Sequence, residues 1–304
     1  MPLMIICSLL FLGLLLFCPE AAIQGSKYGS ALWLNELIPT LLPFFIGLRL
    51  FQLCLPKAAS HKAFLLLGLL CGYPSGASLV ADQYKQGLLT TTQAYFYLGF
   101  VNNPSPMFIL SFCSYTILGM SLSSALMFFG LIVCSSFAGS LLFRLPLKII
   151  GRKTKSQKPN RLSPLCPPVH PVQKDPNISR TRQLDTIILE SFILITKIGG
   201  YVILFSILGQ FLRGFLSPSN ISGILCLGSI EITSGVSYLQ ISTLPLGIKE
   251  VLTASLLAFG GLSAAAQTSS VLSQSGLSLF PYIINKLINA GFAGLLCYLL
   301  FSTL

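Results

Sequence analysis

The chain has 304 residues, of which 53% are hydrophobic and only 9% are charged. Soluble domains carry about 25% charged residues, so this chain lacks the polar surface that coats a water-soluble globule. The composition also excludes an intrinsically disordered chain, which has few apolar residues and many charges. It predicts an all-α polytopic membrane protein, whose surroundings are the lipid bilayer.

The net charge of +11 is concentrated in one part of the chain. Residues 144–182 hold ten basic side chains and a single acid, Asp175, so this part alone carries +9. The excess is therefore local and does not indicate a nucleic-acid-binding face, and we expect no nucleic-acid partner. Because positive loops resist translocation, this part of the chain should face the cytoplasm.

The first predicted element is a membrane helix at 3–18, inside an N-terminal unit, 1–30, that also holds a connection. A secretory signal would place Lys or Arg before the apolar run, and the first basic residue here is Lys27. A helix that crosses the ~30 Å hydrocarbon core needs about 20 apolar residues. Further runs of this kind lie at 31–55, 120–143, 187–212 and 281–302.

Two more zones, 63–116 and 221–272, are apolar but interrupted by glycine, proline and polar residues. Between them, residues 144–186 are rich in proline, lysine, arginine and serine, which predicts an extended cytoplasmic linker. The linker separates a first half, 31–143, from a second half, 187–304. We expect about eight membrane segments in all, some of them broken.

The interruptions of the first half predict helix breaks at membrane depth. Pro74 lacks the backbone donor that a helix needs, and Gly72 beside it frees the backbone. Asn103 precedes a proline, which disfavours the helical conformation. Broken backbone is tolerated in a membrane only where it is buried in protein or lines a water-filled cavity. Both breaks therefore leave polar backbone groups free to meet a solute or an ion.

The second half has interruptions at 229–237 and 259–267. A single shift of 159 residues brings both onto the breaks of the first half without a gap, although only six residues are identical over 64–110. Paired broken segments at corresponding positions of two halves indicate the binding site of a transporter.

The polar residues of the four breaks form the candidate site. Half-helices that start near Gly76 and Gly235 would present free N–H groups, which bind an anion without a buried lysine. The alternative is that small polar residues let helices pack closely and bond to each other. The candidate substrate-binding residues are Tyr73, Ser75, Gly76, Ser78, Asn102, Asn103, Ser105, Thr233, Ser234, Gly235, Ser263 and Gln267. The candidate helix-breaking residues are Gly72, Pro74, Pro104, Pro106, Gly260 and Gly261.

Two charged residues join this set in a coupling or structural role. A carboxylate at the bilayer centre costs ~2.5–3.5 kcal/mol on insertion scales. Glu231 should therefore face the protein interior, where it either couples transport to a cation or a proton or caps a helix. Lys197, near the start of the run 187–212, is a further candidate for binding an anion. The alternative for Lys197 is that it snorkels to the headgroups.

Six stretches stand in an order that is typical of one family. They are Leu37-Ile38-Pro39-Thr40-Leu41-Leu42-Pro43, Gly72-Tyr73-Pro74-Ser75-Gly76-Ala77, Asn102-Asn103-Pro104-Ser105-Pro106, Ile198-Gly199-Gly200-Tyr201, Glu231-Ile232-Thr233-Ser234-Gly235, and Phe259-Gly260-Gly261-Leu262-Ser263 with Gln267. Over most of residues 31–302 the sequence thus resembles the YlbJ-type sporulation integral membrane proteins. Members of that family carry two nucleoside recognition, or Gate, domains related in architecture to concentrative nucleoside transporters.

The resemblance implies two Gate-type repeats, inverted with respect to each other, with re-entrant hairpins and broken helices. It also implies a multi-pass membrane transporter that moves dipicolinic acid across the outer forespore membrane during sporulation. The Gate likeness leaves a second reading open, in which the solute is a nucleoside or another small metabolite. A third reading is a non-transporting scaffold of sporulation whose basic linker binds a partner or anionic lipid.

An enzyme is not expected. The stretch Gly-x-x-Ser-Gly at 72–76 is not the nucleophile elbow of a serine hydrolase, and both histidines, His61 and His170, lie in polar connections. The nine cysteines show no C-x-x-C spacing and no His neighbours, so we expect no metal site and no cofactor. The sequence leaves the coupling ion open, and it equally leaves open whether the protein forms a homo-oligomer.

Overall fold

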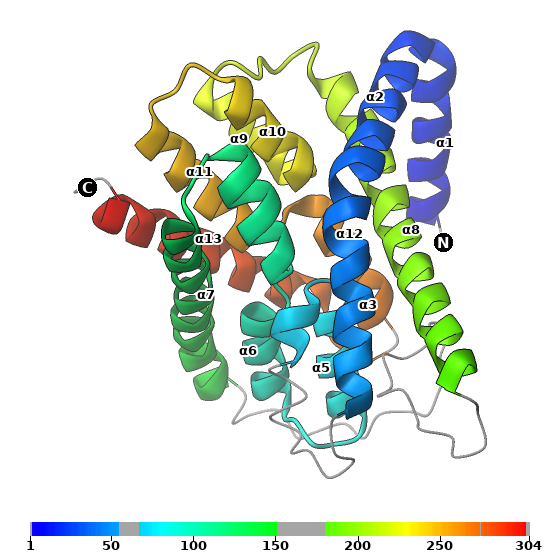
Figure 1. The fold of residues 1–304 in the computed structure, drawn as a ribbon. Helices are drawn as coiled ribbons and strands as arrows, with labels where there is room; N and C mark the ends of the chain where they lie inside the picture. Colours follow the sequence, from blue (N-terminus) through cyan, green and yellow to red (C-terminus); the bar gives the residue numbers. More distant parts are fainter. Residues whose placement is uncertain (1, 55–66, 151–179, 274, 302–304) are drawn as a thin grey trace.

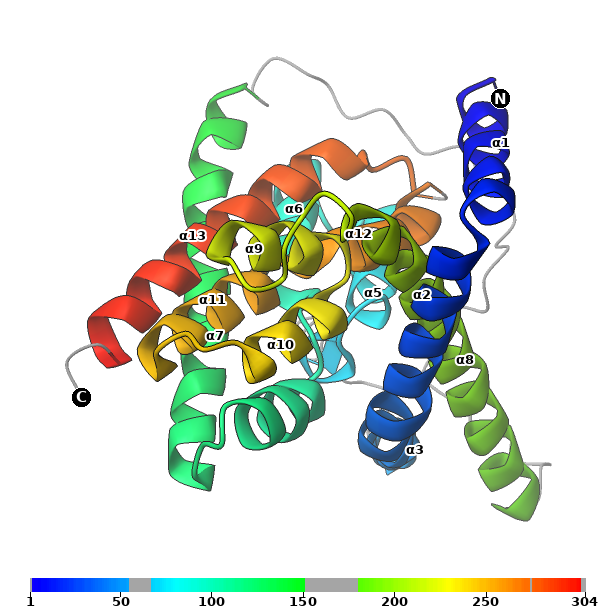
Figure 2. The same cartoon turned by 90° about the horizontal axis from the view of Figure 1, so that it is seen from above.

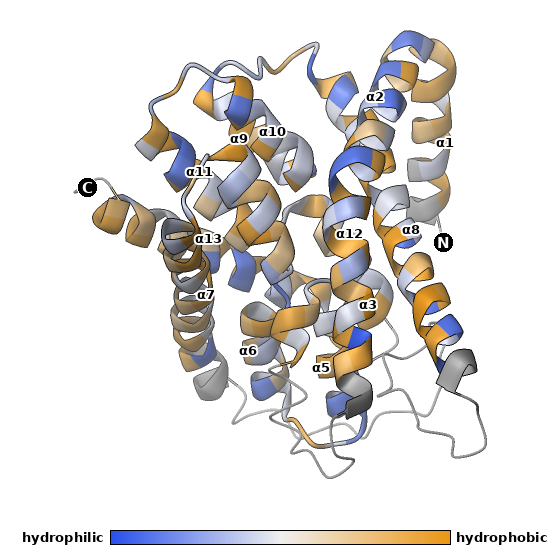
Figure 3. Ribbon diagram, in the orientation of Figure 1, coloured by the Kyte–Doolittle hydropathy of each residue, from blue (hydrophilic) through white to orange (hydrophobic). Residues whose placement is uncertain are grey.

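The computed structural model describes residues 2–54, 67–150, 180–273 and 275–301. Within these ranges every regular element is a helix, which confirms the all-α prediction (Figure 1). Five helices are long and apolar enough to cross a bilayer, and their outward faces carry large apolar side chains (Figure 3). The chain is a polytopic membrane protein.

The N-terminal part consists of a short helix followed by a long one. α1 (Pro2–Phe17) has 16 residues and lies beside the upper part of the long helix in Figure 1. The long helix joins α2 (Pro19–Leu32), the π-helix η1 (Trp33–Leu37) and α3 (Ile38–Cys54). Pro19 stands at its first position, where a missing N–H is harmless. The helix therefore starts well before the predicted run at 31, while α1 is shorter than a typical span of about 20 residues.

The first half continues with short helices. Residues 67–71 are helical, and after a turn at 72–74 the chain forms α5 (Ser75–Lys85). α6 (Thr91–Val101) begins with a capping box in which Thr90 and Gln93 satisfy each other's backbone N–H groups. An irregular stretch then leads to the π-helix η2 (Phe108–Ile117) and to α7 (Leu122–Ile150).

The second half repeats this order of elements. The long helix α8 (Arg180–Leu212) is followed by α9 (Ile221–Ile230) and α10 (Ile232–Ile241), which meet at Glu231. α11 (Leu246–Phe259) and α12 (Gly261–Leu272) meet at Gly260, and α13 (Leu279–Phe301) ends the described chain. In Figure 1, α5 and α6 lie at the lower end of the molecule, whereas α9 and α10 lie at the upper end.

Most of the predicted spans coincide with helices of the structure. The runs 120–143, 187–212 and 281–302 each match a candidate span within a few residues. A further candidate span, Leu246–Leu272, lies in the second interrupted zone and contains the break at Gly260. At the two ends of the predicted linker, residues 144–150 continue α7 and residues 180–186 begin α8; the rest lies outside the described residues.

One group of helices, which we call the α2–α8 group, consists of α2, η1, α3 and α8. Its helices touch backbone to backbone, because a Cβ at Gly25 would lie 2.7 Å from Cα of Ile207 and one at Gly29 would lie 2.8 Å from Cα of Ile203. An ion pair of 2.8 Å between Arg49 and Glu190 joins α3 to α8.

The remaining helices form a second body around α7, α11 and α13. α13 packs extensively on α11 and on α7, and α6 packs on α7. Contacts between this body and the α2–α8 group are much less extensive. The candidate cavity described below lies on the seam between the two bodies.

Candidate functional site

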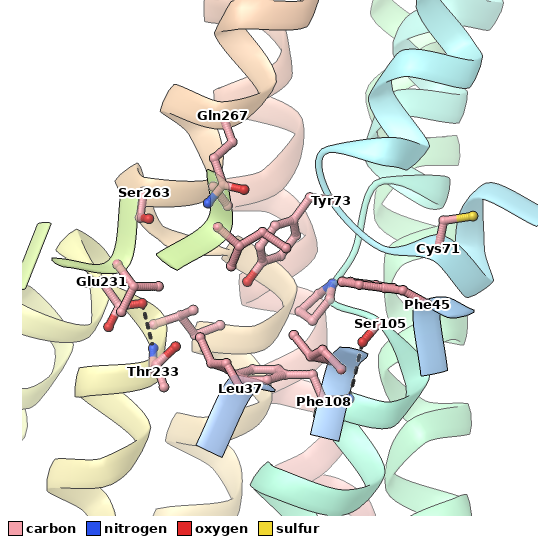
Figure 4. A pocket seen from close by; sticks show the side chains of 16 residues that line it. Leu37, Phe45, Cys71, Tyr73, Ser105, Phe108, Glu231, Thr233, Ser263 and Gln267 are labelled. Carbon is pink, nitrogen blue, oxygen red and sulfur yellow. Dashed lines mark hydrogen bonds between the residues drawn. The ribbon is translucent and has the colours of Figure 1, made fainter. Parts of the chain in front are cut away.

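All four helix breaks contribute to one small cavity on the seam. Its polar lining comes from Tyr73 of the first break, Ser105 of the second, Glu231 and Thr233 of the third, and Ser263 and Gln267 of the fourth (Figure 4). Its apolar lining includes Leu41 and Phe45 of α3 and Ile198 and Val202 of α8. The cavity measures about 30 Å³, which is room for ordered water but not for an organic solute.

The first two breaks hold each other in place. The backbone N–H of Tyr73 donates to the carbonyl of Asn103 over 2.9 Å, and the N–H of Ala77 donates to Oδ1 of Asn102 over 3.1 Å. Oγ of Ser105 accepts a 3.2 Å bond from the N–H of Phe108, the first residue of η2. The two interruptions therefore form one hydrogen-bonded unit, although 25 residues separate Ala77 from Asn102.

Glu231 forms the third break. Its backbone is extended, and its carboxylate accepts bonds from the N–H groups of Thr233 (3.0 Å) and Ser234 (2.6 Å) at the start of α10. Only 2% of the residue is exposed, and it lines the cavity. Glu231 is therefore a helix cap, one of the two roles considered from the sequence, and its side chain also lines the cavity. These N–H groups stand at the positive end of the α10 dipole and stabilise a charge on the carboxyl group, whereas its burial disfavours that charge.

The fourth break depends on two consecutive glycines. Gly260 and Gly261 adopt φ values of +86° and +77°, a conformation that side chains disfavour. Gly261 approaches the carbonyl groups at the end of α9, since a Cβ there would lie 3.3 Å from the oxygen of Ser229. The two breaks of the second half are thus in contact, as are those of the first half.

Two polar atoms of the cavity wall have no hydrogen-bond partner in the described structure. They are Oγ of Ser263 and Oε1 of Gln267, whose residues are 2% and 3% exposed. The ring of Tyr73 reaches from the opposite side toward Gln267 and Glu231 (Figure 4). Buried polar atoms without partners cost free energy, so this wall is suited to water or to a polar solute.

A second polar cluster lies behind the second break. Lys286 of α13 is 1% exposed, and its ammonium group donates to Oδ1 of Asn103 (2.7 Å) and to the carbonyl of Asn102 (3.3 Å). The side-chain amide of Asn102 donates to Thr268 and to the hydroxyl of Tyr282, each over 2.9 Å. Both asparagines therefore stabilise the end of α6 rather than lining the cavity.

Further asparagines of α13 extend this cluster. Asn285 donates to the carbonyl of Tyr95 over 2.8 Å, and Asn289 donates to the carbonyl of Gly99 over 3.0 Å. Ser140 of α7 bonds to Asn285 as well, over 3.1 Å. Because α6 ends at a break, its last carbonyls lack helical partners, and Asn289 satisfies that of Gly99. We call Asn102, Asn103, Asn285, Lys286 and Asn289 with their partners the α6-end network.

Other predicted site residues lie outside the cavity. Ser75 and Gly76 begin α5, and Ser78 follows them on the same helix. Ser234 lies 3.3 Å from the hydroxyl of Ser206 on α8. Gly235 packs against Gly228 of α9. The N–H groups expected to be free at the two half-helix starts donate to Asn102 and Glu231 instead.

Lys197 requires a correction. It was expected near a helix start, but α8 begins at Arg180, so Lys197 lies well inside the helix. Its side chain is exposed and does not line the cavity. The reason is that the polar residues before 187 continue the helix.

Lys286 is a candidate functional residue that is not among those predicted from the sequence. A signal was present, because Lys286 is a basic residue within the run 281–302, and an ionisable residue inside a span marks a functional-site candidate. Asn285 and Asn289 lie four residues apart on the same helix as Lys286. Within the described ranges, no group of His, Cys, Asp and Glu could hold a metal ion.

Comparison with known proteins gives one informative relative. The chain is 25% identical, over an alignment of 332 residues, to the sporulation integral membrane protein YlbJ of Bacillus subtilis (strain 168). The alignment covers 94% of this chain and 79% of that protein. No family model matches the chain, and no solved structure matches it. The likeness to YlbJ supports the assignment to the YlbJ-type proteins that the motifs indicated.

Proposed function

We propose that this protein is a membrane carrier, not an enzyme, and that it moves a small polar or anionic solute. The observation that carries the proposal is the convergence of four helix breaks on one buried cavity with two unpartnered polar atoms, Ser263 Oγ and Gln267 Oε1. A membrane protein keeps broken backbone at depth only where it is buried or lines a path for polar species. A scaffold has no use for such a site.

The solute to test first is dipicolinic acid. The support for it is the likeness to YlbJ, a sporulation protein by its printed name. Under this proposal the protein acts in the outer forespore membrane, with the basic linker in the cytoplasm and two inverted repeats forming the path. The opposite placement of α5–α6 and α9–α10 in Figure 1 supports the inversion.

The cavity must open for transport. At about 30 Å³ it admits no aromatic dicarboxylate, so the structure corresponds to a closed state in the proposed cycle. Toward the upper end it is bounded by Phe108, whose ring centroid lies 5.2 Å from that of Phe112. Phe112 lines a second cavity above. In the proposed cycle this aromatic pair separates the central cavity from the upper one.

The anion would be bound by neutral groups in the open state. Ser263 and Gln267 offer a hydroxyl and an amide, and Tyr73 offers a ring and a hydroxyl. Ionised Glu231 would repel a carboxylate at this distance, so we propose that Glu231 carries a proton or a coupling cation when the solute is bound. This assigns to Glu231 the coupling role in the carrier.

The deciding experiment is uptake by purified protein in proteoliposomes. Labelled dipicolinate and labelled uridine are offered in parallel, with protein-free vesicles as the blank. Dipicolinate uptake without uridine uptake supports the proposal. Uridine uptake without dipicolinate uptake would indicate that the solute is a nucleoside. Uptake of neither compound would favour a non-transporting scaffold. Gln267→Ala should abolish uptake, whereas Ser123→Ala, at an exposed position of α7, should not.

A further inference from the structure

The upper cavity has the features of a separate binding site. It measures about 350 Å³, within the range of roughly 300–1,000 Å³ typical of ligand sites. It lies where α2, η2, α10 and the end of α8 meet, and Figure 2 shows α2 and α10 near each other from above. We call it the vestibule. Its lining includes Tyr28, Glu36, Arg213 and Tyr238.

The vestibule combines a cation with two parallel aromatic rings. The rings of Tyr28 and Tyr238 are 5.9 Å apart at an interplanar angle of 3°. The guanidinium carbon of Arg213 lies 5.4 Å from the centroid of the Tyr238 ring. Arg213 is exposed, so its charge meets the aqueous phase, whereas Tyr238 is only 6% exposed. A planar fork of donors beside flat rings suits a ligand that is itself flat and carries a carboxylate.

The vestibule also lies next to the central cavity. Glu36 and Leu37 are consecutive, and Glu36 lines the vestibule while Leu37 lines the central cavity. Along α10, Ser237 of the vestibule lies one turn beyond Thr233 of the central cavity. A ligand in the vestibule is thus about one helical turn from the lining of the central cavity.

The position of the vestibule along α8 defines its side of the membrane. Arg213 directly follows the last residue of α8, whereas the basic linker leads into the first residue, Arg180. A helix of this length, 33 residues, is about 50 Å long. The vestibule therefore lies at the end of the molecule opposite to the linker.

From these observations we infer that the vestibule is an outer binding site for planar aromatic carboxylates. Arg213 binds the carboxylate, and the Tyr28–Tyr238 pair contacts the ring. Glu36 gives the site a negative group, so a dicarboxylate such as the proposed solute binds here, but more weakly than it would without Glu36. The inference deepens the proposed carrier function and rests on it for its purpose, because this site would load or receive the solute on the side opposite to the linker.

The test is equilibrium binding, which needs no transport. Purified full-length protein in detergent is titrated by calorimetry with pyridine-2-carboxylate, pyridine-2,6-dicarboxylate and glutarate. We expect the two pyridine carboxylates to bind and glutarate, which has no ring, not to bind. Arg213→Gln should raise Kd for both by about tenfold. Glu36→Gln should lower Kd, and lower it more for the dicarboxylate than for the monocarboxylate.

Lys27→Gln is the matched control. It removes a positive charge from an exposed position of α2 at the same end of the molecule, beside but outside the vestibule lining. Its Kd should stay within about twofold of the parent value. Arg213→Lys, which keeps the charge and loses the planar fork, should show an intermediate Kd. Melting temperatures of all variants show whether they are folded.

The outcomes separate this inference from the carrier proposal. Equal Kd values for Arg213→Gln and Lys27→Gln would overturn the vestibule site, even if dipicolinate uptake by proteoliposomes is normal. Binding that depends on Arg213 without any uptake would support the vestibule and count against the carrier. Binding of glutarate as tight as that of the dicarboxylate would also overturn the inference, because the rings would then contribute nothing.

Discussion

The ammonium group of Lys286 donates a 2.7 Å hydrogen bond to Oδ1 of Asn103, although the two residues are 183 positions apart in the chain. Among the described residues no carboxylate lies within salt-bridge distance of Lys286. The positive charge instead faces the carbonyl end of α6, where the helix dipole is negative. The break in α6 and the charge in α13 therefore stabilise each other.

This pairing predicts a coupled loss of stability. Lys286→Met removes two hydrogen bonds of the α6-end network and should lower the free energy of unfolding by about 1–3 kcal/mol. Asn103→Ala should do the same, and the double variant should lose less than the sum, with a coupling of about 1 kcal/mol. Unfolding in mixed detergent measures all three. Lys27→Met, at an exposed site, is the control, and strictly additive losses would contradict the pairing.

The two roles of Glu231 can be separated. Glu231→Gln keeps an oxygen acceptor for the start of α10, whereas Glu231→Ala keeps none and should cost about 1 kcal/mol more in stability. Both variants should lose uptake, because neither carries a titratable group. Melting temperature and proteoliposome uptake are the two measurements. Glu250→Gln changes another largely buried acid, outside the cavity lining, and should retain uptake. Full uptake by Glu231→Gln would show that Glu231 does not couple transport to a proton or a cation.

The fourth break should resist substitution. Gly260→Ala and Gly261→Ala force an alanine into the left-handed conformation, at a cost of about 1–2 kcal/mol each. Gly291→Ala is the matched control, because Gly291 lies inside α13 with nothing within 4 Å of the added methyl group. The control should be neutral or gain up to about 1 kcal/mol. Equal melting temperatures for the three variants would show that Gly260 and Gly261 do not adopt the left-handed conformation.

Close packing of α2 on α8 predicts another contrast. Gly25→Val and Gly29→Val insert side chains where backbone atoms of α8 lie within 3 Å, so both should lower the melting temperature by several degrees. Gly47→Val, on α3 of the same long helix, meets nothing within 4 Å and should have a small effect. Equal effects at the three positions would mean that α2 and α8 are not in contact.

The orientation in the membrane can be tested with cysteines. Cys18 lies between α1 and α2 and is exposed, whereas Cys166 belongs to the predicted linker. One variant retains only Cys18 and another retains only Cys166. The two variants should react with a membrane-impermeant maleimide from opposite sides of the membrane. Cys166 should react from the cytoplasmic side. Labelling of both from one side would contradict the predicted topology.

The helix breaks could be predicted because their causes are local. Pro74, the Asn103-Pro104 pair and the Gly260-Gly261 pair each disfavour a continuous helix, and each lies at a break in the structure. The partners of the breaks could not be predicted in the same way. Lys286 meets Asn103 only because α13 packs on α6, and the sequence contains no local trace of that contact.

Two further features depend on tertiary structure. The N–H groups at the start of α10 looked available to a solute, but the residue before the helix accepts them. The observed helix ends also differ from the predicted ones. α8 begins at Arg180, before the predicted run 187–212, because the residues at its start are polar and the prediction relied on apolar residues. A window of hydrophobic residues measures the membrane-embedded part of a helix, and a helix that continues into water extends beyond it.

The seam between the α2–α8 group and the remaining helices has a consequence for the surrounding lipid. The α6-end network lies wholly on one side of the seam, so the two bodies can separate without breaking it. Leu41, Phe45 and Val202 line the seam with apolar side chains, and beside them the rings of Tyr28 and Tyr238 stack and Ser206 lies 3.3 Å from Ser234. Lipid tails can replace apolar contacts at little cost but cannot replace hydrogen bonds. Acyl-chain composition should therefore control how readily the cavity opens.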